Sequence, residues 1–355
     1  MSSVASFEIA YHQYLDASSQ VTAPLPAFVD DKQSVLALYK MMTLLRLFDT
    51  KAIALQRTGR MGTYASTLGQ EAIGVALGHV MQAQDILAPA YREYGAMLQR
   101  GVRMRDILLY WGGDERGMDY QGAAREDLPI CVPIASQVPQ AVGVAYAIKL
   151  RGEARVVVCV CGDGATSKGD FYEGLNAAAL WQLPVLFVVN NNQWAISVPR
   201  RHQSHAQTLA QKAIAAGMPG EQVDGNDVLA MTDRCSLALQ EIRDGAGPRL
   251  IEALSYRLCD HTTADDAQRY RNENEVEQQR QAEPIARLQN WMRQRGEWDD
   301  EREQQLLQSC SEQIDVEVEE YLNMPALPAT SMFDYLYQEL PAALRAQQAE
   351  LKERQ

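Results

Sequence analysis

The sequence predicts an α/β fold in which a mostly parallel sheet is flanked by helices. Two short runs, Arg155–Cys161 and Val185–Val189, are apolar and rich in β-branched residues, which is typical of strands buried on both faces of a parallel sheet. Between them, Phe171, Leu175 and Ala178 recur at helical spacing. A strand, a helix and a second strand in this order favour a right-handed crossover, so the two strands should be parallel.

The composition is that of a folded protein with a sizeable core. Of the 355 residues, 46% are hydrophobic and 22% are charged, which excludes a disordered chain. The formal net charge of −13 argues against a nucleic-acid partner, because such binders need a basic surface. No apolar run approaches the ~20 residues that cross a bilayer, which argues against a membrane partner. The N-terminus lacks an export signal and the six cysteines have no zinc or redox spacing, so we expect a cytoplasmic protein.

Three segments of the chain differ in composition. Residues 1–30 are polar, contain two prolines and predict an N-terminal arm. Residues 31–270 alternate helix-like and strand-like patterns and predict the α/β domain, beginning with a helical stripe over Ser34–Gln56. Residues 271–355 are rich in Gln, Glu and Arg and predict a helical extension whose charged helices form a solvated face or a subunit contact. Further helices are expected over 69–80, 139–150, 273–295, 299–321 and 341–354.

The residues that point to chemistry follow the two predicted strands. Gly162–Gly164 (Gly-Asp-Gly) comes after the first strand, and Asn190–Asn192 ends the second. Because the carboxyl ends of parallel strands lie at one edge of a sheet, where such sheets bind ligands, these residues should lie close together. Their oxygen atoms suit Mg²⁺, and a helix expected to begin near Thr166–Lys168 offers free amides to a phosphate. Either motif alone is usually a plain turn or loop, but together they predict a magnesium diphosphate site.

The same segment resembles a known family. GDG followed almost thirty positions later by NN is similar to the fingerprint of enzymes that bind thiamine diphosphate through Mg²⁺. The longer stretch GDGATSKGDFYEGLNAAALWQLPVLFVVNNNQWAIS resembles the alpha subunit of the decarboxylating first component of 2-oxo acid dehydrogenase complexes. Matching text also includes RTGRMGTYASTLGQEA, APAYREYGAMLQRG and TLAQKAIAAGMPGEQVDGND. The branch that it resembles most is bacterial pyruvate dehydrogenase, while PIASQVPQAVG and HTTADD are also similar to branched-chain enzymes.

The resemblance implies a thiamine diphosphate-binding fold and a set of ligands for its cofactor. Asp163, Asn192 and the main-chain oxygen of Trp194 would bind Mg²⁺. A guanidinium can bind two phosphate oxygens while a phenol donates a further hydrogen bond. The residues implied to contact the diphosphate are Tyr91, Arg92, Gly164 and Ala165.

Other positions would contact the rings of the cofactor or act in the reaction. Val132 and Ile134 match positions that hold the aminopyrimidine and thiazolium rings, and Ala195 would also contact the cofactor. His261, in the loop DHTTADD, matches a catalytic histidine with proposed roles in diphosphate contact and proton transfer. Imidazole suits proton transfer because its ordinary pKa is about 6.5.

Two positions depart from the pattern of the family. Thr63 stands where relatives often carry an aromatic residue, and this difference affects the approach to the active site. Asn190 stands at the arginine of the arginine-plus-NN pattern that branched-chain relatives resemble. One cation expected near the diphosphate is therefore missing. These departures motivate one alternative hypothesis, a non-catalytic scaffold or regulatory subunit.

The resemblance also implies an activity and partners. The activity is oxidative decarboxylation of pyruvate, a small 2-oxo acid, and reductive acetylation of a lipoyl group on a partner acyltransferase. Within this class the alternatives are a branched-chain acid, 3-methyl-2-oxobutanoate, and more distantly acetoin. The family takes a glutamate that protonates the aminopyrimidine from a beta subunit, and Glu71 is expected to be only a helix residue. The resemblance therefore implies an α2β2 heterotetramer with the active site at the subunit interface, and a chain that is inactive alone.

Overall fold

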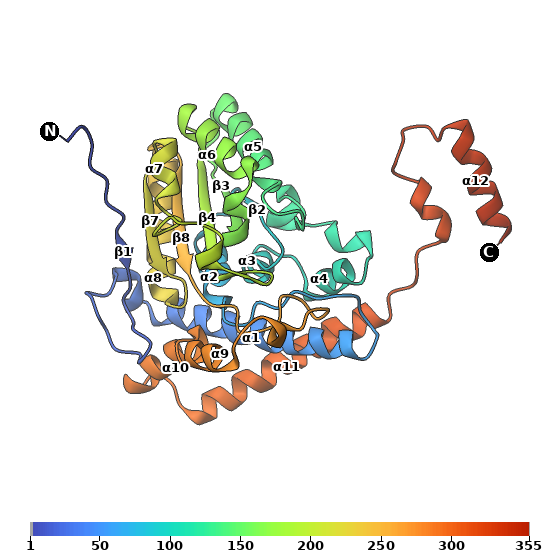
Figure 1. The fold of residues 1–355 in the computed structure, drawn as a ribbon. Helices are drawn as coiled ribbons and strands as arrows, with labels where there is room; N and C mark the ends of the chain where they lie inside the picture. The colour runs from blue at the N-terminus through green and yellow to red at the C-terminus, as the bar shows by residue number, and fades with distance from the viewer. Residues whose placement is uncertain (1–2, 355) are drawn as a thin grey trace.

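The computed structural model describes residues 3–354 and contains a six-stranded sheet with helices on both faces (Figure 1). The strand order is β1-β7-β8-β4-β3-β2, and every neighbouring pair in this sheet is parallel. The strands of the sheet are β1 (Tyr11–His12), β2 (Ile86–Ala88), β3 (Val157–Gly162), β4 (Val185–Asn191), β7 (Gly220–Asp224) and β8 (Arg249–Leu254). Two further strands, β5 (Trp194–Ala195) and β6 (Val198–Pro199), form a small antiparallel hairpin. The predicted α/β fold is confirmed.

Helices cover both faces of the sheet. The larger layer includes α1 and α2, and the smaller layer includes α5 and α6 (Figure 1). In chain order the helices are α1 (Lys32–Arg57), α2 (Glu71–Val80), α3 (Tyr94–Gln99), α4 (Met104–Trp111), α5 (Gln137–Arg151), α6 (Gly169–Leu180), α7 (Lys212–Ala216), α8 (Val228–Arg243), α9 (Glu273–Arg280), α10 (Pro284–Gln294), α11 (Asp300–Leu322) and α12 (Ala342–Glu353). Among the residues described, no helix is both long and apolar enough to cross a bilayer.

The two central strands explain why the sequence shows uninterrupted apolar runs. Val158 and Val160 of β3 lie in the core beneath α1, α2 and α8, whereas Val157 and Cys159 lie in the core beneath α5 and α6. Successive side chains of a strand point to opposite faces, and here both faces are buried. An alternating polar pattern is therefore absent from β3 and β4.

The N-terminal arm and the first part of the C-terminal extension pack onto the domain, whereas residues 325–354 stand apart from it (Figure 1). Within the expected arm, β1 pairs with β7 at the edge of the sheet, and Leu15 is buried. The helical extension is less solvated than its composition indicates, because α10 and α11 pack along α1 and bury Trp291 and Ile314. Arg287 of α10 joins these parts by donating hydrogen bonds to the main-chain oxygen of Leu15 (3.1 Å) and to Asp224 (2.6 Å).

Two helix boundaries differ from the sequence-based expectation. The helix after the Gly-Asp-Gly motif begins at Gly169, because Asp163–Ser167 forms a 3-10 turn first. The helix expected over 273–295 is divided into α9 and α10 at Pro284, which lacks the N–H needed to continue a helix. Glu283 caps α10 by accepting hydrogen bonds from the amides of Ile285 and Ala286.

The substitution Arg287→Met should lower the free energy of unfolding by roughly 3–5 kcal/mol, because it leaves the buried Asp224 carboxylate without its cation. The matched variant Arg293→Met removes an exposed ion pair with Asp300 and should cost only about 0–1 kcal/mol. Urea unfolding followed by circular dichroism measures both. Equal losses in the two variants would contradict the role assigned to Arg287.

Candidate cofactor site

A cavity of about 530 Å³ lies at the carboxyl edge of the sheet, beside the ends of β3 and β4. Every residue that the sequence assigned to the cofactor site lines this cavity. They are Tyr91, Arg92, Val132, Ile134, Asp163, Gly164, Ala165, Asn192, Trp194, Ala195 and His261. The cavity has a polar end, at Asp163 and Asn192, and an apolar side that includes Val132 and Ile134.

The alternation of side chains along β4 separates the three consecutive asparagines. Asn190 and Asn192 line the cavity, and their amide nitrogens donate to Oε1 of Gln70 at 3.0 and 2.9 Å. Asn191 points to the other side of the sheet, where it donates to Glu252 (2.6 Å) and borders a second cavity of about 890 Å³. Because the side-chain nitrogen of Asn192 donates to Gln70, this hydrogen bond sets the orientation of the Asn192 amide and thereby the position of its oxygen. The sequence analysis did not single out Gln70, although it lies in one of the matching stretches.

The arrangement around Asp163 fits a magnesium ion. The carboxylate is buried, burial raises its pKa, and it accepts one hydrogen bond from Nε2 of Gln203 (2.7 Å). A buried carboxylate favours a nearby cation, and Asn192 and Trp194 line the same cavity. The side-chain oxygen of Asn192 accepts from the main-chain N–H of Trp194 (3.2 Å), and the main-chain oxygen of Trp194 accepts from Nη1 of Arg257 (3.4 Å). Across residues 3–354, no three His, Cys, Asp or Glu side chains gather as a metal site. One carboxylate together with neutral oxygens would suit Mg²⁺ rather than zinc.

The turn that carries Asp163 packs closely against the hairpin that carries Trp194. A Cβ placed on Gly164 would lie 2.6 Å from the Cβ of Ala195, so a larger residue at position 164 would push the two segments apart. Gln193 and Ile196, on either side of β5, have positive φ angles of 71° and 55°. Such conformations are costly for residues other than glycine and are common at functional sites. The close packing keeps the main-chain groups of both segments at the cavity wall.

Two arginines hold His261 at the polar end of the cavity. Arg92 places Nη2 3.2 Å from Nδ1 of His261, and the fully buried Arg257 places Nη1 3.4 Å from the same atom. Burial, followed by the charges of Arg92 and Arg257, lowers the pKa of His261 to about 4. Asp265 accepts a hydrogen bond from the main-chain N–H of His261 (2.8 Å), which anchors the loop. The imidazole is therefore neutral at physiological pH.

A buried aspartate supports Arg92 from behind. The carboxylate of Asp49 in α1 accepts hydrogen bonds from the hydroxyls of Tyr64 (2.5 Å), Ser66 (2.7 Å) and Thr67 (2.8 Å). The main-chain oxygen of Ser66 in turn accepts from Nη1 of Arg92 (2.5 Å). Asp49 thus positions the loop that holds Arg92. Sequence reasoning missed this residue, although an acidic residue within the apolar stripe of the first helix was a usable signal.

Counting only the described residues, two buried glutamines in the cavity wall each have one unpaired polar atom. Nε2 of Gln70 and Oε1 of Gln137 have no hydrogen-bond partner within the described part of the chain, and both residues line the cavity. The other end of Gln137 is fixed, because its Nε2 donates to the main-chain oxygen of Val160 (2.7 Å). Buried polar atoms are nearly always satisfied in folded proteins. These two unpaired atoms are therefore exceptions within the wall of the cavity.

We expect the imidazole of His261 to titrate with a pKa of about 4, and the pKa to rise toward its ordinary value of about 6.5 in Arg92→Met, which removes one neighbouring cation. NMR of ¹³C-labelled histidine measures both values.

The same pKa affects stability. The unfolded histidine binds its proton at higher pH than the folded one, so this group lowers the free energy of unfolding as the pH falls from about 6.5 to about 4. The exposed substitution Arg302→Met is the control and should leave the pKa unchanged. A midpoint near 6.5 in the unmodified chain would contradict the assigned environment.

Comparisons with known proteins identify the family of this chain. The family model described as "Dehydrogenase E1 component" matches residues 39–329. The pyruvate dehydrogenase E1 component subunit alpha of Acholeplasma laidlawii is 40% identical over 326 residues, which cover 90% of this chain and 93% of that protein. The proteins of the same name from Staphylococcus aureus and Staphylococcus epidermidis are 35% identical over 346 residues, covering 97% of this chain and 93% of each relative. The resemblance found in the sequence is confirmed, and the chain belongs to the dehydrogenase E1 component family.

Proposed function

We propose that this chain is the alpha subunit of a pyruvate dehydrogenase E1 component and binds the diphosphate end of magnesium thiamine diphosphate. Family membership and the names of the relatives support the reaction class. The observation that carries the proposal is the meeting of Asp163, Asn192, Arg92 and His261 in one cavity. An intact constellation of this kind gives no support to the alternative of a non-catalytic scaffold.

The charges that line the cavity explain why Mg²⁺ and the diphosphate would be bound together. Asp163, Asn192 and the carbonyl of Trp194 would hold Mg²⁺, which compensates the buried carboxylate. At the same end, Arg92 and Arg257 bring two cations around a neutral histidine. A diphosphate would balance these cations, with further contacts from Tyr91 and the amides of Gly164 and Ala165.

His261 would then hold a proton at a defined atom. Its Nδ1 faces two guanidinium groups, so Nδ1 accepts and the proton of the neutral ring lies on Nε2. Asp265 holds the loop of His261 by accepting from its main-chain N–H, and the hydroxyl of Tyr270 holds Arg257 by accepting from Nη2. When bound, thiamine diphosphate supplies the electron sink for loss of CO₂ from a 2-oxo acid. The residues of this chain bind and orient the cofactor and position the proton on His261.

The apolar side of the cavity is partly exposed. Val132 and Ile134, which line it, are about half-exposed. Exposed apolar surface commonly marks a protein interface. We propose that a beta subunit covers this side of the cavity in an α2β2 heterotetramer and that a lipoyl-bearing acyltransferase accepts the acyl group. We further propose a division into an arm (1–30), the cofactor-binding domain (31–270) and a helical extension (271–355).

Replacing Asp163 by alanine should weaken Mg²⁺-dependent binding of thiamine diphosphate by more than about 100-fold, because it removes the only charged ligand proposed for the metal. Calorimetry on the chain reconstituted with its beta subunit measures this binding. Asp170→Ala, in the first turn of α6, is the matched control and should bind normally. Unchanged metal-dependent binding in the Asp163→Ala enzyme would refute the proposed site.

A comparison of adjacent asparagines tests the same site independently. Asn192→Ala should weaken Mg²⁺ binding, whereas Asn191→Ala should not, because its side chain points to the other side of the sheet. The measurement is the Mg²⁺ concentration that gives half-maximal cofactor binding. Equal effects in the two variants would show that β4 does not present Asn192 to the metal.

The size of the substrate side chain is the other property to test. Thr63 and Trp111 lie on the cavity wall, and we expect kcat/KM to be higher for pyruvate than for 3-methyl-2-oxobutanoate. Thr63→Phe should increase this preference by narrowing the wall, and Thr63→Ser is the matched control. A substrate panel with the reconstituted enzyme gives the values. A preference for 3-methyl-2-oxobutanoate would overturn the choice of pyruvate.

A further inference from the structure

The proposed site leaves one buried lysine without a role. Lys212 begins the short helix α7, within the stretch TLAQKAIAAG, and α7 packs against α6. The residue is buried. The buried Arg100 and Arg287 pair with carboxylates, whereas Lys212 forms no ion pair with any carboxylate that the structure describes. Burying an unpaired charge is costly, so a lysine at this position needs a physical reason.

The ammonium of Lys212 holds the turn that carries Asp163. Its Nζ donates to the main-chain oxygen of Thr166 (2.7 Å) and to the hydroxyl of Thr166 (2.9 Å). The same hydroxyl donates to the main-chain oxygen of Asp163 (2.8 Å). Thr166 is 1% exposed, which keeps water away from these hydrogen bonds. One hydroxyl therefore connects the charge of Lys212 with the residue proposed to bind Mg²⁺.

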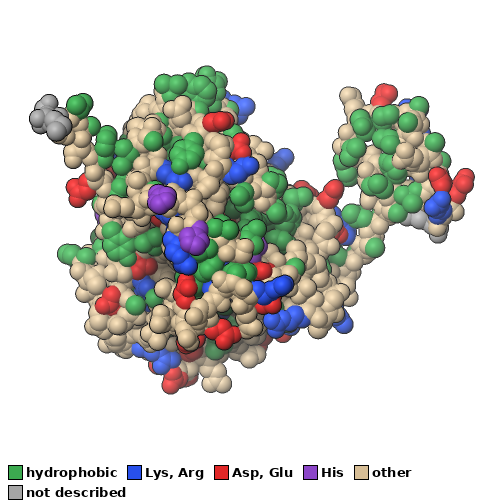
Figure 2. Space-filling model, in the orientation of Figure 1, with side chains coloured by type: hydrophobic (Ala, Val, Ile, Leu, Met, Phe, Trp, Pro, Cys, Tyr) green, Lys and Arg blue, Asp and Glu red, His purple; other side chains and the backbone are tan. Residues whose placement is uncertain are grey.

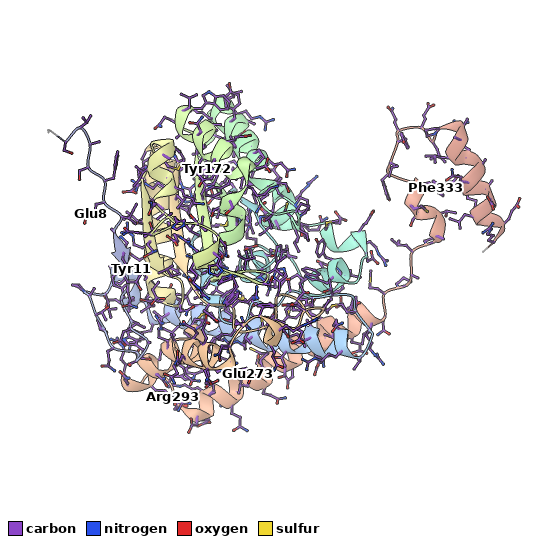
Figure 3. All side chains as sticks on the ribbon, in the orientation of Figure 1. Glu8, Tyr11, Tyr172, Glu273, Arg293 and Phe333 are labelled. Carbon is purple, nitrogen blue, oxygen red and sulfur yellow. The ribbon has the colours of Figure 1, made fainter. Side chains whose placement is uncertain are left out.

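An aromatic ring and a close packing contact hold this arrangement in place. Nζ of Lys212 lies 5.1 Å from the centroid of the ring of Tyr172, which belongs to α6 and is labelled in Figure 3. The face of an aromatic ring attracts a cation. The turn itself also packs against the hairpin, because a Cβ on Gly164 would lie 2.6 Å from the Cβ of Ala195. The turn is thus held by both α7 and the hairpin.

Lys212 also adds a positive charge to a part of the molecule that would bind an anion. The chain has a formal net charge of −13, and Figure 2 shows Lys and Arg side chains interspersed with Asp and Glu. A diphosphate would therefore depend on cations that are gathered locally. Arg92 and Arg257 supply two of them beside His261. Lys212 supplies a third at the turn whose amides would contact the diphosphate.

We propose that Lys212 is a positioning residue for the cofactor site. Through Thr166 it fixes the turn Asp163–Ser167, so that the Asp163 carboxylate faces the metal and the amides of Gly164 and Ala165 face the diphosphate. Lys212 is not among the residues that line the cavity, so it acts through Thr166 and not by touching the cofactor. This inference rests on the proposed function, because it assigns a role within the same site.

The test is the affinity of the reconstituted two-subunit enzyme for thiamine diphosphate at a fixed Mg²⁺ concentration. Lys212→Met keeps an apolar side chain of similar length and removes the ammonium. Calorimetry should show a Kd at least about tenfold higher, because two buried oxygens of Thr166 lose a charged donor. Lys149→Met is the matched control and should leave the Kd unchanged. Lys149 also donates to main-chain oxygens, those of Trp181 and Gln182, which do not line the cavity.

A second variant separates the role of the charge from simple packing, and it decides the question if Lys212→Met does not fold. In Lys212→Ala the missing methylenes and ammonium can be replaced by propylammonium, whereas 1-propanol fills the same space without a charge. Propylammonium should return the Kd to within about threefold of the unmodified enzyme, and 1-propanol should leave it raised. A Kd that both additives lower equally, or that neither lowers, would overturn the positioning role.

The outcomes separate this inference from the proposed function. If the unmodified enzyme binds no thiamine diphosphate in the presence of Mg²⁺, the proposed function is wrong, and the inference falls with it. If the unmodified enzyme binds the cofactor and Lys212→Met binds it equally tightly, only the role of Lys212 is refuted.

Discussion

The parallel pairing of β3 with β4 is the constraint on which the candidate site depends. In this register Gly162 lies opposite Asn190, so the turn with Asp163 and the end of β4 reach the same edge together. Asp163 and Arg92 are both buried and both line the cavity at this edge, and no ion pair joins them among the described residues. Charges of opposite sign that are buried without contacting each other are costly in the free chain. A metal ion and a diphosphate would pair each charge with a partner, which is how the fold prepares this cavity for a charged cofactor.

A second layer of residues holds the groups that face the cavity. Asp49 fixes the loop behind Arg92, Gln70 orients Asn192, and Arg257 connects the hairpin of Trp194 with the loop of His261. These supports come from α1, the start of α2 and the segment after β8. Residues locked by such hydrogen bonds lose little freedom when a ligand binds. The cavity wall is therefore held by hydrogen bonds at its polar end, whereas Val132 and Ile134 on its apolar side are about half-exposed.

The parts of the structure that local pattern controls could be predicted from the sequence. The β-branched runs of β3 and β4, the crossover helix between them and the glycine-rich turn follow from neighbouring residues, and their geometry brought Asp163 and Asn192 to one edge. The second layer could not be predicted, because Gln70 meets Asn192 across 122 positions of chain. Likewise, the Gln- and Glu-rich composition of α11 concealed the apolar stripe that packs on α1, since a helix needs only one buried face.

The central claim is that this chain holds half of a thiamine diphosphate site that a second subunit completes. Native mass spectrometry of the tagged chain, purified from its own cells with Mg²⁺ and thiamine diphosphate present, tests this claim most directly. The account predicts an α2β2 species that carries up to two cofactor molecules, and the sequence of the second subunit should contain a glutamate at the aminopyrimidine. A homo-oligomer that binds no cofactor and recruits no second subunit would contradict it.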